Sequence, residues 1–155
     1  MNTERKLATI LATDCVNFSK HMEEGEELTL SNLNECRKII DEIIANYGGK
    51  IFSTAGDSVV AEFASPVQCV KAAVEFQDKL YERNEHSLTK LPLSWRVGIH
   101  VDDVIVENNN IMGSGVNIAA RLESQSEPGK ILVSKIVKDQ VDKRIDYSIE
   151  ADGTR

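Results

Sequence analysis

The sequence contains few cysteines, and they do not form a ligand pattern. Cys15, Cys36 and Cys69 are scattered along 155 residues without the CxxC spacing that is common in zinc sites. Neither a disulfide framework nor a structural zinc site is therefore expected, and this cysteine usage favours a reducing, cytoplasmic location. Internal repeats and low-complexity linkers are also missing from the sequence. We expect residues 1–155 to form one domain with its own core.

Long apolar runs and basic runs are missing as well. No stretch approaches the length of a membrane-spanning helix, and Met1 to Lys6 lead into a strand without the features of a signal peptide. The chain has 18 Lys and Arg against 25 Asp and Glu, which gives a net charge of −7. Nucleic-acid backbones are bound by stripes of Lys and Arg. We therefore expect no membrane and no nucleic acid as a partner, although a single nucleotide remains compatible with this charge.

The hydrophobic pattern predicts strands that alternate with amphipathic helices. Short apolar runs predict strands at 6–12, in two arms of 50–63, and at 93–106, 130–133 and 145–149. Helical spacing predicts helices from the acidic cluster 23–27 to Tyr47, from the Ser65 cap to Leu80, over 113–123, and after a Ser134 cap. Hairpins mixed with crossover helices predict an α+β sandwich, in which helices pack on one mostly antiparallel sheet with a ferredoxin-like βαββαβ core.

Two acidic residues fall at strand ends. Asp14 follows the strand at 6–12, and Asp57 lies in the turn between the two arms of 50–63. Each residue alone is more often a turn or cap residue. If the two strands are neighbours, however, the two carboxylates could share Mg²⁺ or Mn²⁺ ions whose remaining ligands are substrate phosphates.

A glycine-opened helix supplies a second group of polar side chains. Gly113 and Gly115 open the stretch 113–123, and Asn117 and Arg121 are four residues apart on it, so they share one face. A carboxamide beside a guanidinium suits a phosphate or a developing anion. For an isolated pair of this kind, a solvated helix face would be the favoured explanation. The two upstream acids favour the functional interpretation.

Together these stretches resemble the catalytic domain of class III nucleotidyl cyclases. The resemblance covers nearly the whole chain in the correct order, and the combination is specific although each motif alone is weak. The matching stretches are 11–19, Gly48-Gly49, 54–58, 95–100, 113–123 and 128–134.

The resemblance implies a homodimer with active sites at the interface and two Mg²⁺ or Mn²⁺ ions per site. It implies that Asp14 and Asp57 bind the metals with the carbonyl group of Cys15. The triphosphate would be held by Arg96 and by backbone and hydroxyl groups around Asn17, Phe18 and Ser19. The second copy of the chain would supply Asn117 to orient the ribose and Arg121 to stabilise the transition state.

The residues that read the base depart from the adenylate cyclase pattern. Ser53 stands where adenylate cyclases of this family usually carry Lys, and Asn110 stands where they carry Asp. A site without these adenine readers loses the hydrogen bonds that favour ATP. A short cyclase domain in which both base-reading residues have changed resembles the cyclases of bacterial pyrimidine cyclic-nucleotide antiphage systems (Pycsar). This resemblance favours UTP or CTP as substrate. Strand alternation would place Phe52 on the face opposite Ser53, so we give Phe52 little weight in base choice.

Three alternatives remain open at this stage. The chain could be an adenylate cyclase that reads ATP through backbone groups. It could also be a non-catalytic module that binds a nucleotide and dimerises. This alternative rests on the altered base readers and on the family's closing strands, which often bring a phosphate-binding Lys and are either absent or not included after Ala151 to Arg155. An unrelated palm-like polymerase is disfavoured by the lack of a basic template channel.

Overall fold

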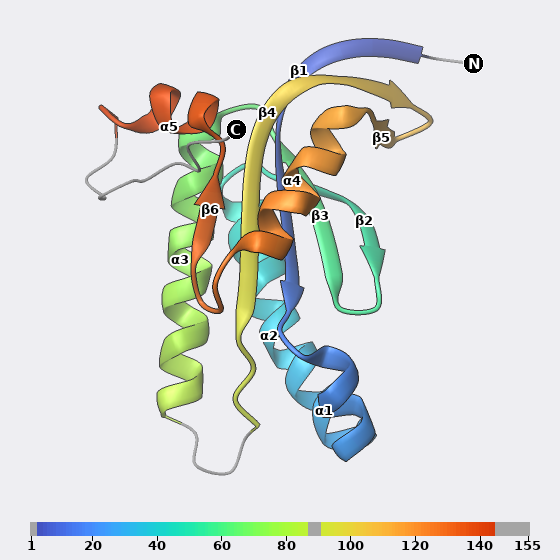
Figure 1. Ribbon diagram of the computed structural model, residues 1–155, viewed down its shortest axis with the longest axis vertical. Helices are drawn as coiled ribbons and strands as arrows, with labels where there is room; N and C mark the ends of the chain where they lie inside the picture. The colour runs from blue at the N-terminus through green and yellow to red at the C-terminus, as the bar shows by residue number, and fades with distance from the viewer. Residues whose placement is uncertain (1–2, 87–90, 145–155) are drawn as a thin grey trace.

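The computed structural model describes residues 3–86 and 91–144 of the chain (Figure 1). Its centre is a six-stranded sheet in the order β2-β3-β1-β4-β5, with β6 pairing with β4 beside that path. The strands are β1 (Thr3–Cys15), β2 (Lys50–Ala55), β3 (Ser58–Phe63), β4 (Trp95–Glu107), β5 (Asn110–Met112) and β6 (Ile131–Val133). Every pair is antiparallel except β4 with β6, which confirms the predicted mostly antiparallel sheet.

Helices cover both faces of this sheet (Figure 1). They are α1 (Phe18–Glu24), α2 (Glu26–Asn46), α3 (Pro66–Glu85), α4 (Ser114–Gln125) and α5 (Lys135–Val141). The apolar stripes of α2, α3 and α5 form the main core against one face of the sheet. Ala119 of α4 packs over the other face in a smaller second core. Because alternate residues of a strand face opposite sides, Leu11 enters the main core while Ile10 enters the second.

The helical region before Gly48 differs from the prediction. A single helix was expected from the acidic cluster 23–27 onward, but Gly25 separates α1 from α2 with an extended backbone (φ −176°, ψ 95°). The Thr29 hydroxyl donates to the His21 carbonyl oxygen at 2.8 Å, which joins the two helices across this break. Helix α1 was not predicted, because its seven residues are too few for a clear apolar period.

The β4–β5 corner and the two predicted serine caps test the local predictions. Asn108 and Asn109 adopt positive φ angles of 53° and 65°, as hairpin turns require, and the chain then pairs back as β5, a strand that was not predicted. Ser65 caps α3 as expected, accepting from the Gln68 amide at 3.2 Å. Ser134 precedes α5, but its side chain makes no cap and instead bonds to His100. The predicted strand at 145–149 lies outside the described residues.

Candidate active site

The two acidic residues lie on neighbouring strands, as the sequence predicted. Asp14 is the penultimate residue of β1, and Asp57 lies in the turn that precedes β3, the antiparallel neighbour of β1. The main-chain amide of Cys15 donates to Asp57 Oδ2 at 2.9 Å, which fixes the second carboxylate beside the end of β1. Burial and the Asp57 charge raise the pKa of the Cys15 thiol to about 12. The thiol therefore stays protonated, and Cys15 contributes to this cluster through its main chain.

Arg96 pairs with Asp14 across two strands. The two residues are register partners on β4 and β1, and Arg96 Nε and Nη2 donate to the two carboxylate oxygens of Asp14 at 3.1 and 2.9 Å. This bidentate pair raises the pKa of Arg96. Arg96 Nη1 also donates to the Ser124 carbonyl oxygen at 3.2 Å. The sequence prediction placed Arg96 on the triphosphate, whereas in this structure its partners are Asp14 and the C-terminal part of α4.

Glu123 is a site residue that the sequence reasoning missed. It is buried in α4, and its Oε2 lies 3.8 Å from Arg96 Nη2. Burial and the nearby Asp14 charge raise the pKa of Glu123 to about 7, although Arg96 opposes the shift. The sequence contained a signal for Glu123, because it shares one helix face with Gly115, Ala119 and Leu122. An acidic residue on a buried helix face is unusual and indicates a specific role.

The acidic pair has the properties of a site for a hard cation that is shared with a substrate. Burial raises the pKa of Asp57, and the Asp14 charge adds to the shift, so the pair carries crowded negative charge that a cation would relieve. Among the described residues, no group of three or more Asp, Glu, His or Cys could enclose a metal. Two carboxylates therefore fit Mg²⁺ or Mn²⁺ only as a partial ligand set, with phosphate and water oxygens completing it. Arg96 competes with such a cation for the Asp14 oxygens.

Asn117 and Arg121 lie on the exposed face of α4, opposite its buried stripe. Within the described residues, neither side chain makes a hydrogen bond or ion pair with Asp14, Asp57 or Arg96. The single chain thus does not bring these two residues into contact with the acidic cluster, and both remain available to another molecule.

The segment after β1 turns sharply into α1. Asn17 adopts a left-handed conformation (φ 57°), and its carbonyl oxygen accepts from the His21 amide at 3.0 Å. The Phe18 side chain is partly buried and packs against the main core. Asn17 and Ser19 are exposed next to the end of β1. The three predicted triphosphate residues thus follow the end of β1 closely in the chain, and two of them have exposed side chains.

A β-bulge corrects the expected orientation of Phe52. The β2–β3 register passes from Ile51 opposite Ala61 directly to Ser53 opposite Val60, so Phe52 is an extra residue in β2. Phe52 and Val60 both pack against the second core, and Ser53 shares its side of the sheet with its partner Val60. Phe52 and Ser53 therefore lie on the same face, because the bulge interrupts the strand alternation on which the opposite expectation rested.

Asn110 begins β5 with its side chain exposed. The Ile111 amide donates to Asn110 Oδ1 at 3.0 Å, which assigns the oxygen to this local bond and leaves the amide nitrogen free to donate elsewhere. The second predicted base reader therefore has a free amide nitrogen that can donate, and its oxygen keeps a second lone pair.

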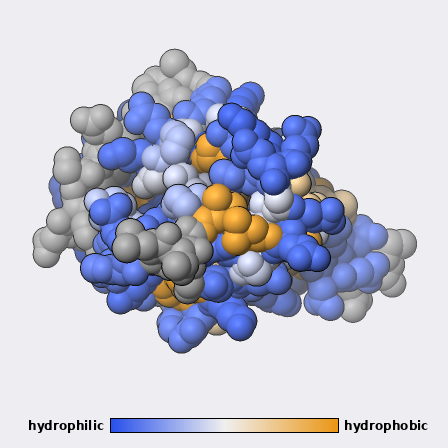
Figure 2. All heavy atoms as spheres, turned by 90° about the horizontal axis from the view of Figure 1, so that it is seen from below, coloured by the Kyte–Doolittle hydropathy of each residue, from blue (hydrophilic) through white to orange (hydrophobic). Residues whose placement is uncertain are grey.

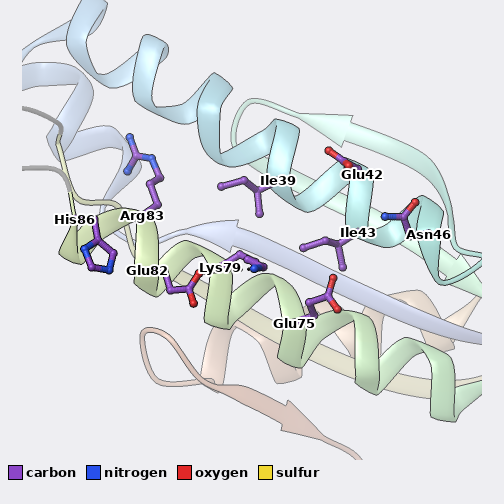
Figure 3. Close-up of a pocket in the computed structure, with 9 residues that line it drawn as sticks. All are labelled: Ile39, Glu42, Ile43, Asn46, Glu75, Lys79, Glu82, Arg83 and His86. Carbon is purple, nitrogen blue, oxygen red and sulfur yellow. Dashed lines mark ion pairs between the residues drawn. The ribbon is translucent and has the colours of Figure 1, made fainter.

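A groove of about 460 Å³ lies elsewhere, between α2 and α3 (Figure 3). Ile39 and Ile43 line it from α2, and Glu75, Lys79 and Arg83 line it from α3. None of the predicted site residues lines this groove. The face seen in Figure 2 is largely hydrophilic, with small separate hydrophobic areas. No described helix has the length and apolar character needed to cross a membrane.

The sheet, its helices and the paired acids define a nucleotide-cyclase-like α+β domain. The family model of the adenylate and guanylate cyclase catalytic domain matches residues 2–154, and the chain belongs to this family. A putative adenylate cyclase 3 of Rhizobium meliloti is 32% identical over 150 residues, which are 96% of this chain and 26% of that protein. The chain thus spans about a quarter of the length of the first curated relatives it matches.

Solved structures agree with this assignment. An adenylate/guanylate cyclase/hydrolase from Silicibacter pomeroyi is 39% identical with a TM-score of 0.86, and the match covers 93% of this chain and 84% of that one. The adenylyl cyclase CyaB from P. aeruginosa is 27% identical with a TM-score of 0.81, and the match covers 94% and 85% of the two chains.

Proposed function

We propose that this domain converts a nucleoside triphosphate into a 3′,5′-cyclic nucleotide and pyrophosphate, in a homodimer with composite sites. The observation that carries the proposal is the acidic cluster at the end of β1. There the Cys15 amide fixes Asp57 at 2.9 Å, and Arg96 holds both oxygens of Asp14. Family membership independently supports nucleotide cyclisation over other phosphoryl chemistry.

The chemistry requires positioning and charge neutralisation more than covalent catalysis. The ribose 3′-oxygen bonds to the α-phosphorus, the bond from that phosphorus to the pyrophosphate oxygen breaks, and the 3′-hydroxyl proton passes to solvent. Asp14, Asp57 and the Cys15 carbonyl would hold two Mg²⁺ or Mn²⁺ ions, which supply activation of the attacking oxygen and neutralisation of the phosphates. Arg96 can exchange Asp14 for the triphosphate, because both partners suit the same bidentate guanidinium geometry. Asn17, Phe18 and Ser19 would bind the triphosphate beside it.

The position of Asn117 and Arg121 supports a composite site. Both are exposed on α4, and in the described structure neither side chain makes a hydrogen bond or ion pair with the acidic pair of its own chain. In a two-fold dimer, α4 of one copy would face the acidic cluster of the other. Asn117 of the partner subunit would orient the ribose, and Arg121 of the partner subunit would stabilise charge on the transferring phosphoryl group.

The base-reading residues support a pyrimidine substrate. Asn110 presents a donor, and Ser53 has a hydroxyl that can donate or accept. Uracil offers carbonyl acceptors and one ring N–H to such groups, whereas the amino groups of adenine and cytosine would both meet the Asn110 donor, so Asn110 favours UTP over ATP and over CTP. Phe52 lies on the same face as Ser53 and adds bulk there, which favours a smaller ring. We therefore propose UTP or CTP as the preferred substrate, with a role in antiphage signalling as the corresponding physiological hypothesis.

Product identification tests the base choice. Equal concentrations of ATP, GTP, CTP and UTP are supplied together with Mn²⁺, and cyclic products are separated by mass. The proposal expects mostly cUMP or cCMP. Mostly cAMP would contradict the pyrimidine preference and support an adenylate cyclase. No cyclic product from any triphosphate, with nucleotide still bound, would contradict catalysis and support a nucleotide-binding dimerisation module.

A further inference from the structure

Helix α4 rests directly on β4 at two places. A Cβ atom added to Gly98 would lie 2.2 Å from the Glu123 amide nitrogen, so strand and helix backbones touch near the C-terminal end of α4. A Cβ atom added to Gly115 would lie 2.7 Å from Asp102 Cβ, so the first turn of α4 touches the Asp102 side chain. Both distances are shorter than real Cβ atoms allow. The same added Cβ would lie 3.5 Å from Asp102 Cγ and Oδ2, so the first turn of α4 also packs against the carboxylate end of Asp102.

Asp102 is held from two directions on β4. Its Oδ1 accepts from the Asp103 amide at 2.8 Å, and its Oδ2 lies 3.4 Å from Nε2 of His100. Nδ1 of the same imidazole ring lies 2.8 Å from the Ser134 hydroxyl oxygen. A carboxylate beside Nε2 favours the tautomer with its hydrogen on Nε2, so that Nδ1 accepts from the Ser134 hydroxyl.

Ser134 belongs to a well-anchored part of the fold. It is 1% exposed, and its amide donates to the Ile99 carbonyl oxygen at 3.1 Å. Directly after it, α5 places Val137 and Val141 in the main core. The contacts from Ser134 through His100 to Asp102 thus connect the β6–α5 junction with the first turn of α4.

These three residues have the composition of a serine-nucleophile triad, but their arrangement does not support hydrolysis. Ser134 is 1% exposed, so a substrate cannot reach its hydroxyl without local opening. Instead, the three residues connect the β6–α5 junction with α4, the helix that carries Asn117 and Arg121.

We propose that His100 is a positioning residue for the reaction. Through its contact with Asp102 it fixes the first turn of α4, and so it sets where the exposed face of α4 presents Asn117 and Arg121. In the described part of the chain, it makes no hydrogen bond or ion pair with the acidic pair or with any residue proposed to bind the triphosphate. A small displacement of α4 would weaken the transition-state contacts without changing how the triphosphate is held.

Two conservative variants separate the contacts of the imidazole ring. His100→Gln places an amide nitrogen near the Nε2 position and keeps a donor for Asp102. His100→Asn places its amide near the Nδ1 position and keeps a partner for Ser134. Thermal unfolding of both variants checks that each is folded, and hydrogen exchange of the α4 amides reports how firmly the helix is held on the sheet without any assay of turnover.

The inference expects faster exchange across α4 in His100→Asn and near-parental exchange in His100→Gln. Faster exchange confined to α5 in His100→Gln, with α4 unchanged in both variants, would overturn it and restrict His100 to the β6–α5 junction. Equally faster α4 amide exchange in both variants would also overturn the inference, because the hydrogen bond donor for Asp102, which only His100→Gln keeps, would then not protect α4.

The kinetic part of the inference rests on the proposed cyclase function. His100→Asn should lower kcat by about 10- to 100-fold with KM nearly unchanged, and His100→Gln should recover most of that loss. A rise in KM as large as the fall in kcat would contradict positioning through α4. If the unchanged protein makes no cyclic nucleotide, the proposed function fails, whereas the hydrogen-exchange comparison still decides whether His100 positions α4.

Discussion

The two faces of the sheet are built on different physical principles. The face covered by α2, α3 and α5 is a continuous apolar core that contains Phe76 and Trp95. The face covered by α4 has a smaller core and two places, Gly98 and Gly115, where helix and strand lie so close that an added Cβ atom would clash. Apolar burial is non-directional and stabilises roughly in proportion to the area removed from water, whereas direct backbone contact defines a position closely. The comparison suggests that one face supplies stability and the other supplies geometry.

The largest expected effect is on turnover alone. Asp57→Asn removes a charge from the acidic pair while an oxygen remains to accept from the Cys15 amide. We expect kcat/KM to fall about 1,000-fold, equivalent to about 4 kcal/mol of transition-state stabilisation. Steady-state cyclic nucleotide formation measures the change.

The matched control is Asp139→Asn, which alters an exposed carboxylate in α5 paired with Lys135. It should leave turnover and unfolding temperature nearly unchanged. Turnover by Asp57→Asn within a few-fold of the parent would contradict a metal-binding role for the acidic pair.

The next effect should fall on stability alone. Phe76 is fully buried in α3, and Phe76→Ala leaves a cavity in the main core. The free energy of unfolding should fall by about 3–5 kcal/mol, measured by urea titration. Tyr81→Ala, on the same helix and 67% exposed, should cost less than about 0.5 kcal/mol.

The comparison of the two faces predicts that folded Phe76→Ala protein keeps most of its turnover at low temperature. A loss of kcat comparable with that of Asp57→Asn, in protein shown to be folded, would mean that the apolar face also sets the geometry of the site.

A smaller effect concerns Glu123 and pH. Its folded-state pKa is about 7 against an ordinary value of 4.5, so between these values the folded protein retains a proton that the unfolded chain releases. This carboxyl therefore makes the protein less stable as pH rises through that window. Relative to the parent, Glu123→Gln should become more stable between about pH 5 and pH 8 in the presence of a chelator.

Urea titrations at several pH values measure this difference, and the exposed Glu127→Gln serves as the control. Stability curves that run parallel for the parent and Glu123→Gln would show that the buried carboxyl does not titrate in this window.

The sequence predicted those features that depend on period, turn chemistry and strand order. Apolar spacing predicted α3 and the second part of α2, and the strand ends predicted that Asp14 and Asp57 would be neighbours. It missed Glu123 because burial of an acid depends on which face of α4 packs on β4. It misplaced Phe52 because a bulge is an interaction of two strands and leaves no periodic signal in one of them.

Subunit complementation tests the central claim, a composite site, most directly. Arg121→Ala and Asp57→Ala proteins are each nearly inactive under this account, and a mixed dimer contains one intact site. Equal mixing with random reassociation should restore about a quarter of the parental activity, since half of the dimers are mixed and each has one of two sites. No recovery, in a mixture where tagged mixed dimers are shown to form, would contradict the composite site.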